Sequence, residues 1–418
     1  MAVVESNVNA LELEKVVPKI AVAFERDDKF FSNIKKREVQ KISARQMRVP
    51  IALRPGGKFK YYNADGGGLG RGGGPTWDKA VVSCVFVAEA IEYTKLTEWA
   101  TNSDAKAIEN APKKMIADTL DELRRQLDSQ MMQDGRGVLG TVTTDTPAGG
   151  SNVITLTTDG FGARLMRFQQ DVQVFDATLV TNRGTATITQ WDVENNTISL
   201  TPQIAGVVAT DLLVADGIAS PLSLPAIYGV PYHHSNSSTG TWLGFPRSTT
   251  PEIRASRVNG NANAFALPLA RLAINKIGNR TGIDNNFVPN AWMHPAQVQA
   301  YEELGQLVSW IQKQPKDESL NLYFGGQMQM AGSNVKQSFN WDKRRIDFVT
   351  DSIWGRGEIL PIGFYTSDGR NIFEIRDSVG GVATADIFYM TVGMQAFVSN
   401  PAACAYIDNL AIPAGYVS

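Results

Sequence analysis

The strongest periodic pattern in the chain covers residues 113–133. Five apolar residues recur there at spacings of four, three, four and four, which places them on one face of a helix. They are Ile116, Leu120, Leu123, Leu127 and Met131. Pro112 suits the first turn of such a helix, and Gly135 suits the position just beyond its end. The pattern predicts an amphipathic helix whose charged, solvated face needs no catalytic role.

Short runs of alternating apolar and polar residues occupy residues 141–217. Turn-forming sequences separate these runs, for example Asn182-Arg183-Gly184 and Glu194-Asn195-Asn196. Short strands at such spacing are typical of a small all-β sandwich or barrel. The segment therefore predicts a β module inserted after the long helix.

A glycine-rich stretch, DGGGLGRGGGPTW, runs from Asp65 to Trp77 and contains G-x-G-x-x-G at Gly68, Gly70 and Gly73. A phosphate-binding loop of this type needs a strand before it and a helix after it, because the helix N-terminus holds the anion. Residues 58–62 favour a strand, but the β-branched run that follows the glycines favours a second strand rather than a helix. We interpret the stretch as the tip of a long hairpin.

Residues 1–45 and the hairpin over 46–80 both lack the apolar residues for a core of their own. Such extensions bury their apolar surface when they lie against a neighbouring copy of the chain. Stability then becomes linked to self-association.

The C-terminal half mixes helices and strands. The predicted elements are a helix over 267–277 ending at Gly278, a strand over 290–294, a helix over 295–304 with Pro295 first, and strands over 387–397 and 403–410.

Composition indicates an ordinary folded protein of two or three domains. The chain has 418 residues, 43% of them hydrophobic, and a formal net charge of −2, so it lacks the basic field of a dedicated nucleic-acid binder. Cys84 and Cys404 lie in apolar runs without a CxxC partner, which predicts buried thiols in a reducing compartment. Without a signal peptide or an apolar run of about 20 residues, we expect cytoplasmic synthesis and no membrane partner.

The sequence offers no pattern for catalysis. His233 and His234 lie in a Ser/Asn-rich stretch and are interpreted as solvated, and neither they nor His294 have the spacing of metal ligands. The basic cluster 343–345 beside Trp341 is interpreted as a solvated strand edge rather than a nucleic-acid contact. We therefore expect no enzyme activity, no cofactor and no metal.

In the order of its elements the chain resembles the major capsid proteins of tailed bacteriophages, whose shell fold is shared with encapsulins and the herpesvirus capsid floor. The resemblance covers most of the chain outside 141–217. The stretches that carry it are the helix 113–133 with MMQDGRGVL at 131–139, NAWMHPAQVQAY at 290–301, and NPAACAY at 400–406 in the closing strands.

The resemblance implies an α+β fold of the phage major capsid type. Its parts would be an N-terminal arm over 1–45, an extended β-hairpin loop over 46–80, a peripheral domain with a spine helix over 81–140 and 380–418, an inserted all-β barrel or sandwich module over 141–217, and an axial domain with returning peripheral segments over 218–379. The extra β module would lie on the outer face of a shell or at contacts between capsomers.

The resemblance also implies self-assembly into hexamers and pentamers of an icosahedral shell that encloses phage double-stranded DNA. The shell would form in the host cytoplasm and become the capsid of the virion. Other implied partners are a portal protein, separate scaffold and decoration proteins, and DNA bound without sequence preference. Contacts between subunits would involve the extended-loop residues Lys58, Lys60, Tyr61, Tyr62, Gly68, Gly70, Arg71 and Trp77. The spine helix would be built on Ile116, Leu120, Leu123 and Leu127.

Some members of the family crosslink an extended-loop lysine to an asparagine, helped by a buried glutamate in the closing strands. Lys58 or Lys60 could supply the amine, but residues 387–407 contain no carboxylate, so we expect no crosslink.

Two other functions stay open. One is an encapsulin-type shell around a cargo enzyme. The other is a carbohydrate-binding or hydrolytic β-rich protein, for which Trp191, Asp192 and Glu194 form the only cluster in the β module, although a hairpin turn explains them better.

Overall fold

The structure is a computed structural model of the 418-residue chain. It describes residues 28–37, 40–54, 56–61, 71–101, 111–143, 152–157, 161–282, 289–309, 329–367, 369–376 and 382–416. These residues fall into two compact units. The first combines the described parts of Met1–Ser32, Cys84–Ser129 and Glu358–Met394, and the second those of Asn33–Ser83, Gln130–Gly357 and Gln395–Ser418.

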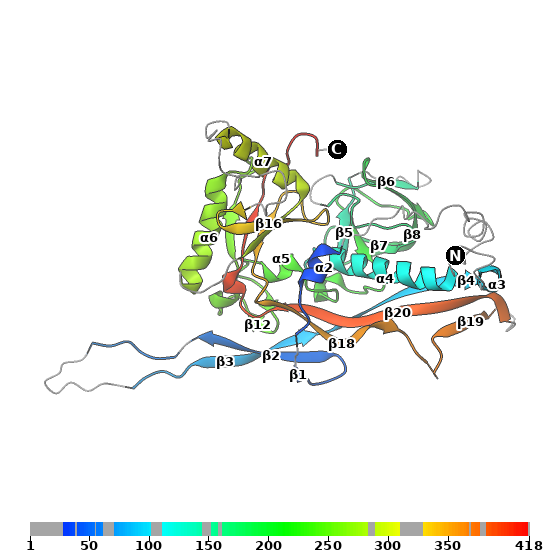
Figure 1. The fold of residues 1–418 in the computed structure, drawn as a ribbon, viewed down its shortest axis with the longest axis horizontal. Coiled ribbons are helices and arrows are strands. Elements are labelled where there is room, and N and C mark those ends of the chain that lie inside the picture. Colours follow the sequence, from blue (N-terminus) through cyan, green and yellow to red (C-terminus); the bar gives the residue numbers. More distant parts are fainter. Residues whose placement is uncertain are drawn as a thin grey trace, which may run out of the picture. The chain divides into compact units, whose positions relative to one another are not determined.

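An antiparallel sheet forms the first unit. Strand β20 lies between β18 and β19 and also pairs with β4, in register from Ala385 opposite Thr94 to Met394 opposite Val85. The elements are β4 (Val85–Thr94), α3 (Lys95–Thr101), α4 (Ala111–Gln130), β18 (Trp354–Phe364), β19 (Ile372–Arg376) and β20 (Val382–Val398). Helix α4 runs beside the long strands (Figure 1).

Helix α4 confirms the predicted amphipathic helix. Pro112 lies in its first turn, and Leu123 and Leu127 are buried. The helix ends at Gln130, earlier than the predicted position near 133. The short helix α2 (Lys29–Asn33) buries Phe30 and Phe31, and the Phe31 amide donates to Asp128 Oδ1 over 2.7 Å. Phe30 and Phe31 of the predicted arm are therefore buried within their own chain, while residues 41–45 are exposed and residues 1–27 lie outside the described residues.

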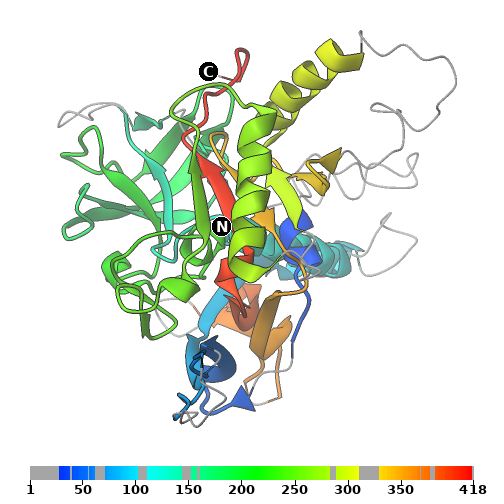
Figure 2. The same cartoon turned by 90° about the vertical axis from the view of Figure 1, so that its left-hand side faces the viewer.

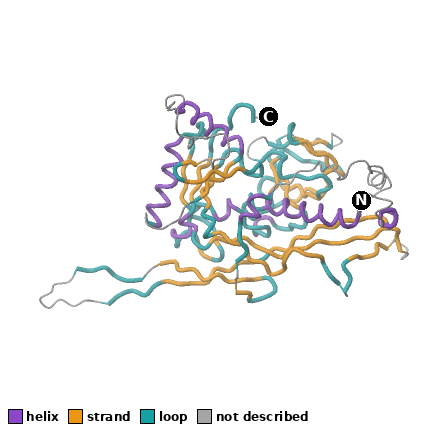
Figure 3. The backbone as a smooth tube through the Cα atoms, in the orientation of Figure 1, coloured by secondary structure: helices purple, strands orange, loops and turns teal. Residues whose placement is uncertain are grey.

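A long antiparallel hairpin, β2 (Gln46–Arg54) and β3 (Thr76–Ser83), belongs to the second unit. Strand β1 (Gln40–Lys41) pairs with β2. Alternate residues of β2, namely Met47, Val49 and Ile51, are buried, while those between them are exposed. The described part of residues 58–62 is not a strand, contrary to prediction. Figure 3 shows the two chain segments continuing beyond the strands as irregular backbone.

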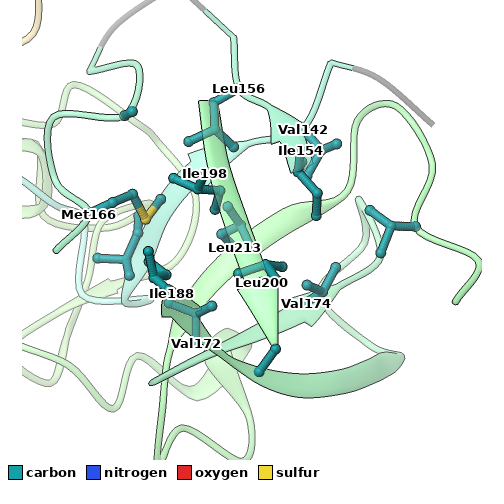
Figure 4. Close-up of a cluster of buried hydrophobic side chains, with 14 of the residues drawn as sticks. Val142, Ile154, Leu156, Met166, Val172, Val174, Ile188, Ile198, Leu200 and Leu213 are labelled. Carbon is teal, nitrogen blue, oxygen red and sulfur yellow. The ribbon is translucent and has the colours of Figure 1, made fainter. Parts of the chain in front are cut away.

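The described residues between 138 and 215 form a closed antiparallel barrel. Its strands are β5 (Val138–Thr141), β6 (Val153–Thr155), β7 (Asp171–Phe175), β8 (Asn182–Asp192), β9 (Thr197–Thr201) and β10 (Leu212–Ala215), in the order β5-β10-β7-β8-β9-β6. A bridge between Val142 and Leu156 closes the ring, with hydrogen bonds of 2.9 Å from the Thr143 amide to the Thr155 carbonyl and 2.8 Å from the Thr157 amide to the Thr141 carbonyl. Branched apolar side chains such as Ile188, Leu200 and Leu213 fill the interior (Figure 4).

A mixed six-stranded sheet forms the rest of the second unit's core, in the order β13-β21-β17-β14-β16-β15. Its strands are β13 (Ser256–Asn259), β14 (Asn290–Met293), β15 (Gln329–Met330), β16 (Ser333–Gln337), β17 (Ile346–Val349) and β21 (Ala405–Asp408). Helix α6 (Leu267–Thr281) packs Ala270, Ala273 and Ile277 against this sheet. Figure 2 shows α6 and the barrel on different sides of it.

One further helix, α7 (Pro295–Ser309), and several short elements complete the second unit. The short elements are α5 (Val230–His233), β11 (Thr241–Trp242), β12 (Phe245–Pro246) and the 3-10 turns Pro221–Ser223, Pro251–Ile253 and Pro401–Ala403. The predicted strand at 290–294 and the helix beginning at Pro295 are both present. Helix α6, however, continues through Gly278 and ends where Gly282 adopts a φ of 88°, because a single glycine weakens a helix without stopping it when one face stays packed.

Candidate subunit-contact site

The hairpin exposes three large aromatic side chains, two of them beyond its paired strands and the third, Trp77, within β3. Phe59 is 89% exposed, Tyr61 87% and Trp77 75%. Phe59 and Tyr61 meet edge to face, with ring centroids 5.1 Å apart. An exposed aromatic group of this size marks an interaction surface more often than a solvated one.

Close backbone contact holds the two sides of the hairpin together past the strands. The Gly57 amide donates to the Gly73 carbonyl over 2.7 Å. A Cβ added at Gly56 would lie 2.4 Å from the Pro75 nitrogen. Glycine is therefore required here for close approach of two backbones, and not for a phosphate.

The hairpin is basic. Residues 46–83 contain six basic and two acidic residues, a net charge of +4, so the rest of the chain carries a net −6. At the end of β2, Arg54 Nε donates to Glu252 Oε1 over 2.8 Å, and this bond raises the pKa of the Arg54 guanidinium. The ion pair ties the hairpin to the turn Pro251–Ile253 of the same unit.

The predicted extended-loop residues fall into two groups. Lys58, Lys60, Tyr61, Arg71 and Trp77 are exposed on the hairpin. Tyr62, Gly68 and Gly70 lie outside the described residues. Their role as contacts between subunits stays a prediction.

The predicted spine residues share one face of α4. Leu123 and Leu127 are buried, and Ile116 and Leu120 are half-buried. In the second unit, Gly135 and Gly137 have φ values of 91° and 75°, and a Cβ at Gly137 would lie 2.2 Å from Ile218 Cδ1. The glycines of the DGRG stretch are therefore needed for a left-handed, closely packed turn.

The interpretation of His233 and His234 as solvated was wrong. Both are fully buried at the end of α5. Trp242 Nε1 donates to His233 Nδ1 over 3.0 Å, and His233 Nε2 contacts the Ala396 carbonyl at 3.3 Å. Burial, assisted by the charge of His234, lowers the pKa of His233 to about 3. A Ser/Asn-rich flank suggested a loop, but neighbouring aromatic rings exclude water from both imidazoles.

The basic cluster 343–345 is not a solvated strand edge either. Arg345 donates twice to the buried carboxylate of Asp347, with 2.8 Å from Nε to Oδ2 and 2.8 Å from Nη2 to Oδ1. Trp341, 2% exposed, donates to Asp347 Oδ2 over 3.1 Å, so it does not present a face to nucleic acid. The sequence does place a cation and a carboxylate two residues apart, at Arg345 and Asp347, and this spacing could have indicated the ion pair.

His294 has a structural role at the start of α7. Its Nδ1 accepts from the Ala296 amide over 3.0 Å, which satisfies one of the unpaired donors of the first helical turn. Burial, together with the positive charges of Lys343 and Arg164, lowers the pKa of His294 to about 4.

The sequence did not identify a half-buried carboxyl group in the first unit. Glu89 on β4 lies opposite Met390 of β20. Burial, and then the charge of Glu122, raises the pKa of Glu89 to about 8, while Arg125 opposes the shift. Glu89 lies on β4, the strand paired with β20, and therefore outside the closing strands 387–407 that lack a carboxylate.

The cluster proposed for carbohydrate binding has structural partners. Trp191 Nε1 donates to the Ala163 carbonyl over 2.8 Å. Asp192 accepts from the amides of Glu194 and Asn195 over 2.9 and 3.1 Å, which caps the turn between β8 and β9. Neither side chain forms an open binding platform.

Within the described residues, no helix has the length and hydropathy to cross a membrane. In the same residues, no three His, Cys, Asp or Glu side chains gather in a way that could hold a metal ion. Within the described residues, neither Cys84 nor Cys404 forms a disulfide; Cys404 is buried and Cys84 is half-buried.

Comparison with known proteins gives matches in structure only. No protein-family model and no curated protein sequence matches the chain. The capsid of cyanophage A-1(L) is similar, with a TM-score of 0.56 and 12% identity over 94% of this chain and 96% of that one. Similar at lower TM-scores are the capsid of the native GTA particle (0.46, 12% identity, 98% and 100% covered) and the SrpI encapsulin of Synechococcus elongatus (0.47, 7%, 98% and 97%). With its α+β architecture, the chain has the fold of phage major capsid proteins.

Proposed function

We propose that this protein is a major capsid protein whose copies assemble into the hexamers and pentamers of an icosahedral shell around phage double-stranded DNA. The observation that most supports this proposal is the exposure of Phe59, Tyr61 and Trp77 on the hairpin. Burying such rings against another copy supplies the apolar driving force of assembly. The basic hairpin and the acidic remainder of the chain give complementary charge for the same contact.

In this proposal the hairpin is the extended loop that lies over an adjacent subunit, and α4 is the spine helix of the peripheral domain. The segment 218–379 supplies the axial domain, and the barrel is an insertion at the shell surface. The protein acts structurally and not as an enzyme. Its partners are other copies, a portal protein, and scaffold and decoration proteins where these are separate chains.

Electron microscopy of the purified protein tests the proposal. We expect closed, uniform icosahedral particles from the wild type and from Trp77→Phe, which keeps an aromatic ring on the hairpin. Trp77→Ser should reduce the particle yield at least about tenfold, because a large apolar contact is lost. A discrete monomer or small oligomer from the wild type under every condition would contradict a shell function.

The contents of the particles separate the phage shell from the cargo compartment. Nuclease-protected double-stranded DNA in particles from infected cells is the outcome expected here. A single co-purifying enzyme in place of DNA would instead support the encapsulin alternative.

A further inference from the structure

A basic pocket lies between β13 and α6 in the second unit. Its volume is about 350 Å³, and four cationic side chains line it: Arg254, Arg257, Lys276 and Arg280. Two hydrogen bonds connect the side chains of α6 to the backbone on the other side of the pocket. Lys276 Nζ donates to the Arg257 carbonyl over 2.6 Å, and Arg280 Nη2 donates to the Pro251 carbonyl over 2.8 Å.

Two carboxylates stand near the pocket, and each is already paired with an arginine. Asp408 accepts from Arg257 Nε through both oxygens, at 2.9 and 2.8 Å. Glu252 accepts from Arg54. These two pairs cancel four of the formal charges around the pocket.

The other three cations donate to main-chain oxygens. Arg254 Nε donates to the Arg247 carbonyl over 2.8 Å, and Lys276 and Arg280 use the carbonyls described above. A carbonyl satisfies a donor but carries no formal charge, so among the described residues these three positive charges have no carboxylate of their own. Burial lowers the pKa of the Arg280 guanidinium, and Arg254 lowers it further against the opposing charge of Glu252.

Donor groups remain for a ligand. A guanidinium has five N–H groups and an ammonium three. Arg257 uses Nε for Asp408, and Lys276 uses one N–H for a carbonyl. Planar guanidinium forks match the oxygen spacing of phosphate, which also brings up to two negative charges, whereas a carboxylate brings one.

We propose that this pocket binds a phosphate group, supplied by a small phosphorylated anion or by a nucleic-acid backbone. The pocket is lined by residues of a single chain, so phosphate binding there does not depend on the proposed shell function.

Isothermal titration of the full-length protein at low ionic strength tests the proposal, with inorganic phosphate in one arm and a short DNA duplex in the other. Lys276→Gln removes one uncompensated charge and keeps a donor for the Arg257 carbonyl. Arg271→Gln is the matched control, because Arg271 is an exposed cation on the same helix that does not line the pocket. We expect at least about a tenfold loss of affinity for Lys276→Gln and none for Arg271→Gln.

Each arm identifies a source. If inorganic phosphate binds, the duplex does not, and Lys276→Gln weakens the phosphate binding, the pocket is a site for a small anion. If the duplex binds and Lys276→Gln weakens that binding, the pocket is a site for a nucleic-acid backbone. Arg280→Gln replaces Lys276→Gln if the latter shows altered thermal unfolding. Absence of saturable binding in both arms, or equal loss in the pocket and control variants, overturns the proposal, whether or not particles form in electron micrographs.

Discussion

His234 Nδ1 lies 2.9 Å from Asp347 Oδ1, and both side chains are buried in the second unit. Burial by itself disfavours the charged imidazole, but Cys404 and Asp347 outweigh it and raise the pKa of His234 to about 9. Burial likewise opposes ionisation of Asp347, yet Arg345 and His234 lower its pKa to about 2. The pair is therefore ionic at neutral pH and joins α5 to β17.

Removing the Asp347 charge should destabilise the protein strongly. Asp347→Asn leaves His234 and Arg345 buried without their anion, and breaking a buried pair in this way costs about 3–5 kcal/mol. Glu252→Gln is the control, since it breaks a solvent-exposed pair with Arg54, and exposed pairs contribute little to stability. Urea unfolding of both variants measures the difference, and equal effects would show that burial of the Asp347 pair adds nothing.

The same pair should make stability depend on pH. His234 binds its proton more tightly in the folded state, so its contribution is complete below the ordinary pKa of 6.5 and is lost as pH rises toward about 9. Asp347 contributes fully above 3.8 and loses its contribution as pH falls toward about 2. Between pH 6.5 and 9, the thermal unfolding temperature should fall less steeply with rising pH in His234→Gln than in the wild type. Parallel curves would assign the decline to other groups.

Glu89 should destabilise the folded state when it ionises, whereas His234 and Asp347 stabilise it in their charged forms. Because its folded pKa is raised from 4.5 to about 8, the folded state holds a proton that the unfolded state has lost, and stability falls as pH rises through this range. Glu89→Gln should therefore be more stable than the wild type at pH 8, by about 1 kcal/mol or more. Glu89→Asp keeps an ionisable group and should retain the decline. A Glu89→Gln curve that falls as steeply as the wild type would refute the assignment.

The DGRG turn should tolerate no side chain at its second glycine. Gly137→Ala combines a φ of 75° with a Cβ 2.2 Å from Ile218 Cδ1, whereas Gly206→Ala has the same φ and no atom within 4 Å. Both variants incur backbone strain of about 1 kcal/mol, and only Gly137→Ala adds overpacking of about 1–3 kcal/mol. Denaturant midpoints give the difference, and equal losses would mean that Ile218 moves aside freely.

Mature particles should contain no covalent multimers. Intact-mass analysis under denaturing conditions is expected to show only species with the mass of a single chain. Residues 387–407 contain no carboxylate that could accept the proton released by a crosslink, although Glu89 lies on β4, which pairs with β20. Species at multiples of the chain mass would contradict the prediction. The single variants Lys58→Arg and Lys60→Arg would then show which lysine supplies the amine.

Sequence pattern identified the elements whose periodicity is local. The 3.6-residue repeat of Leu120, Leu123 and Leu127 marks α4, because a helix satisfies its backbone hydrogen bonds within itself and needs only one apolar face. Alternation likewise marked strands in the segment that forms the barrel. Helix ends were less certain, since packing carries α6 through Gly278.

The sequence by itself therefore determined the order of helices, strands and glycine turns, and with it the resemblance to a capsid fold. Only the tertiary structure decided which charges are buried. It brings His234, Asp347 and Cys404 together from three distant segments, and it gathers Arg254, Lys276 and Arg280 around one pocket. Burial and charge pairing depend on residues far apart in the chain, and no local period records those contacts.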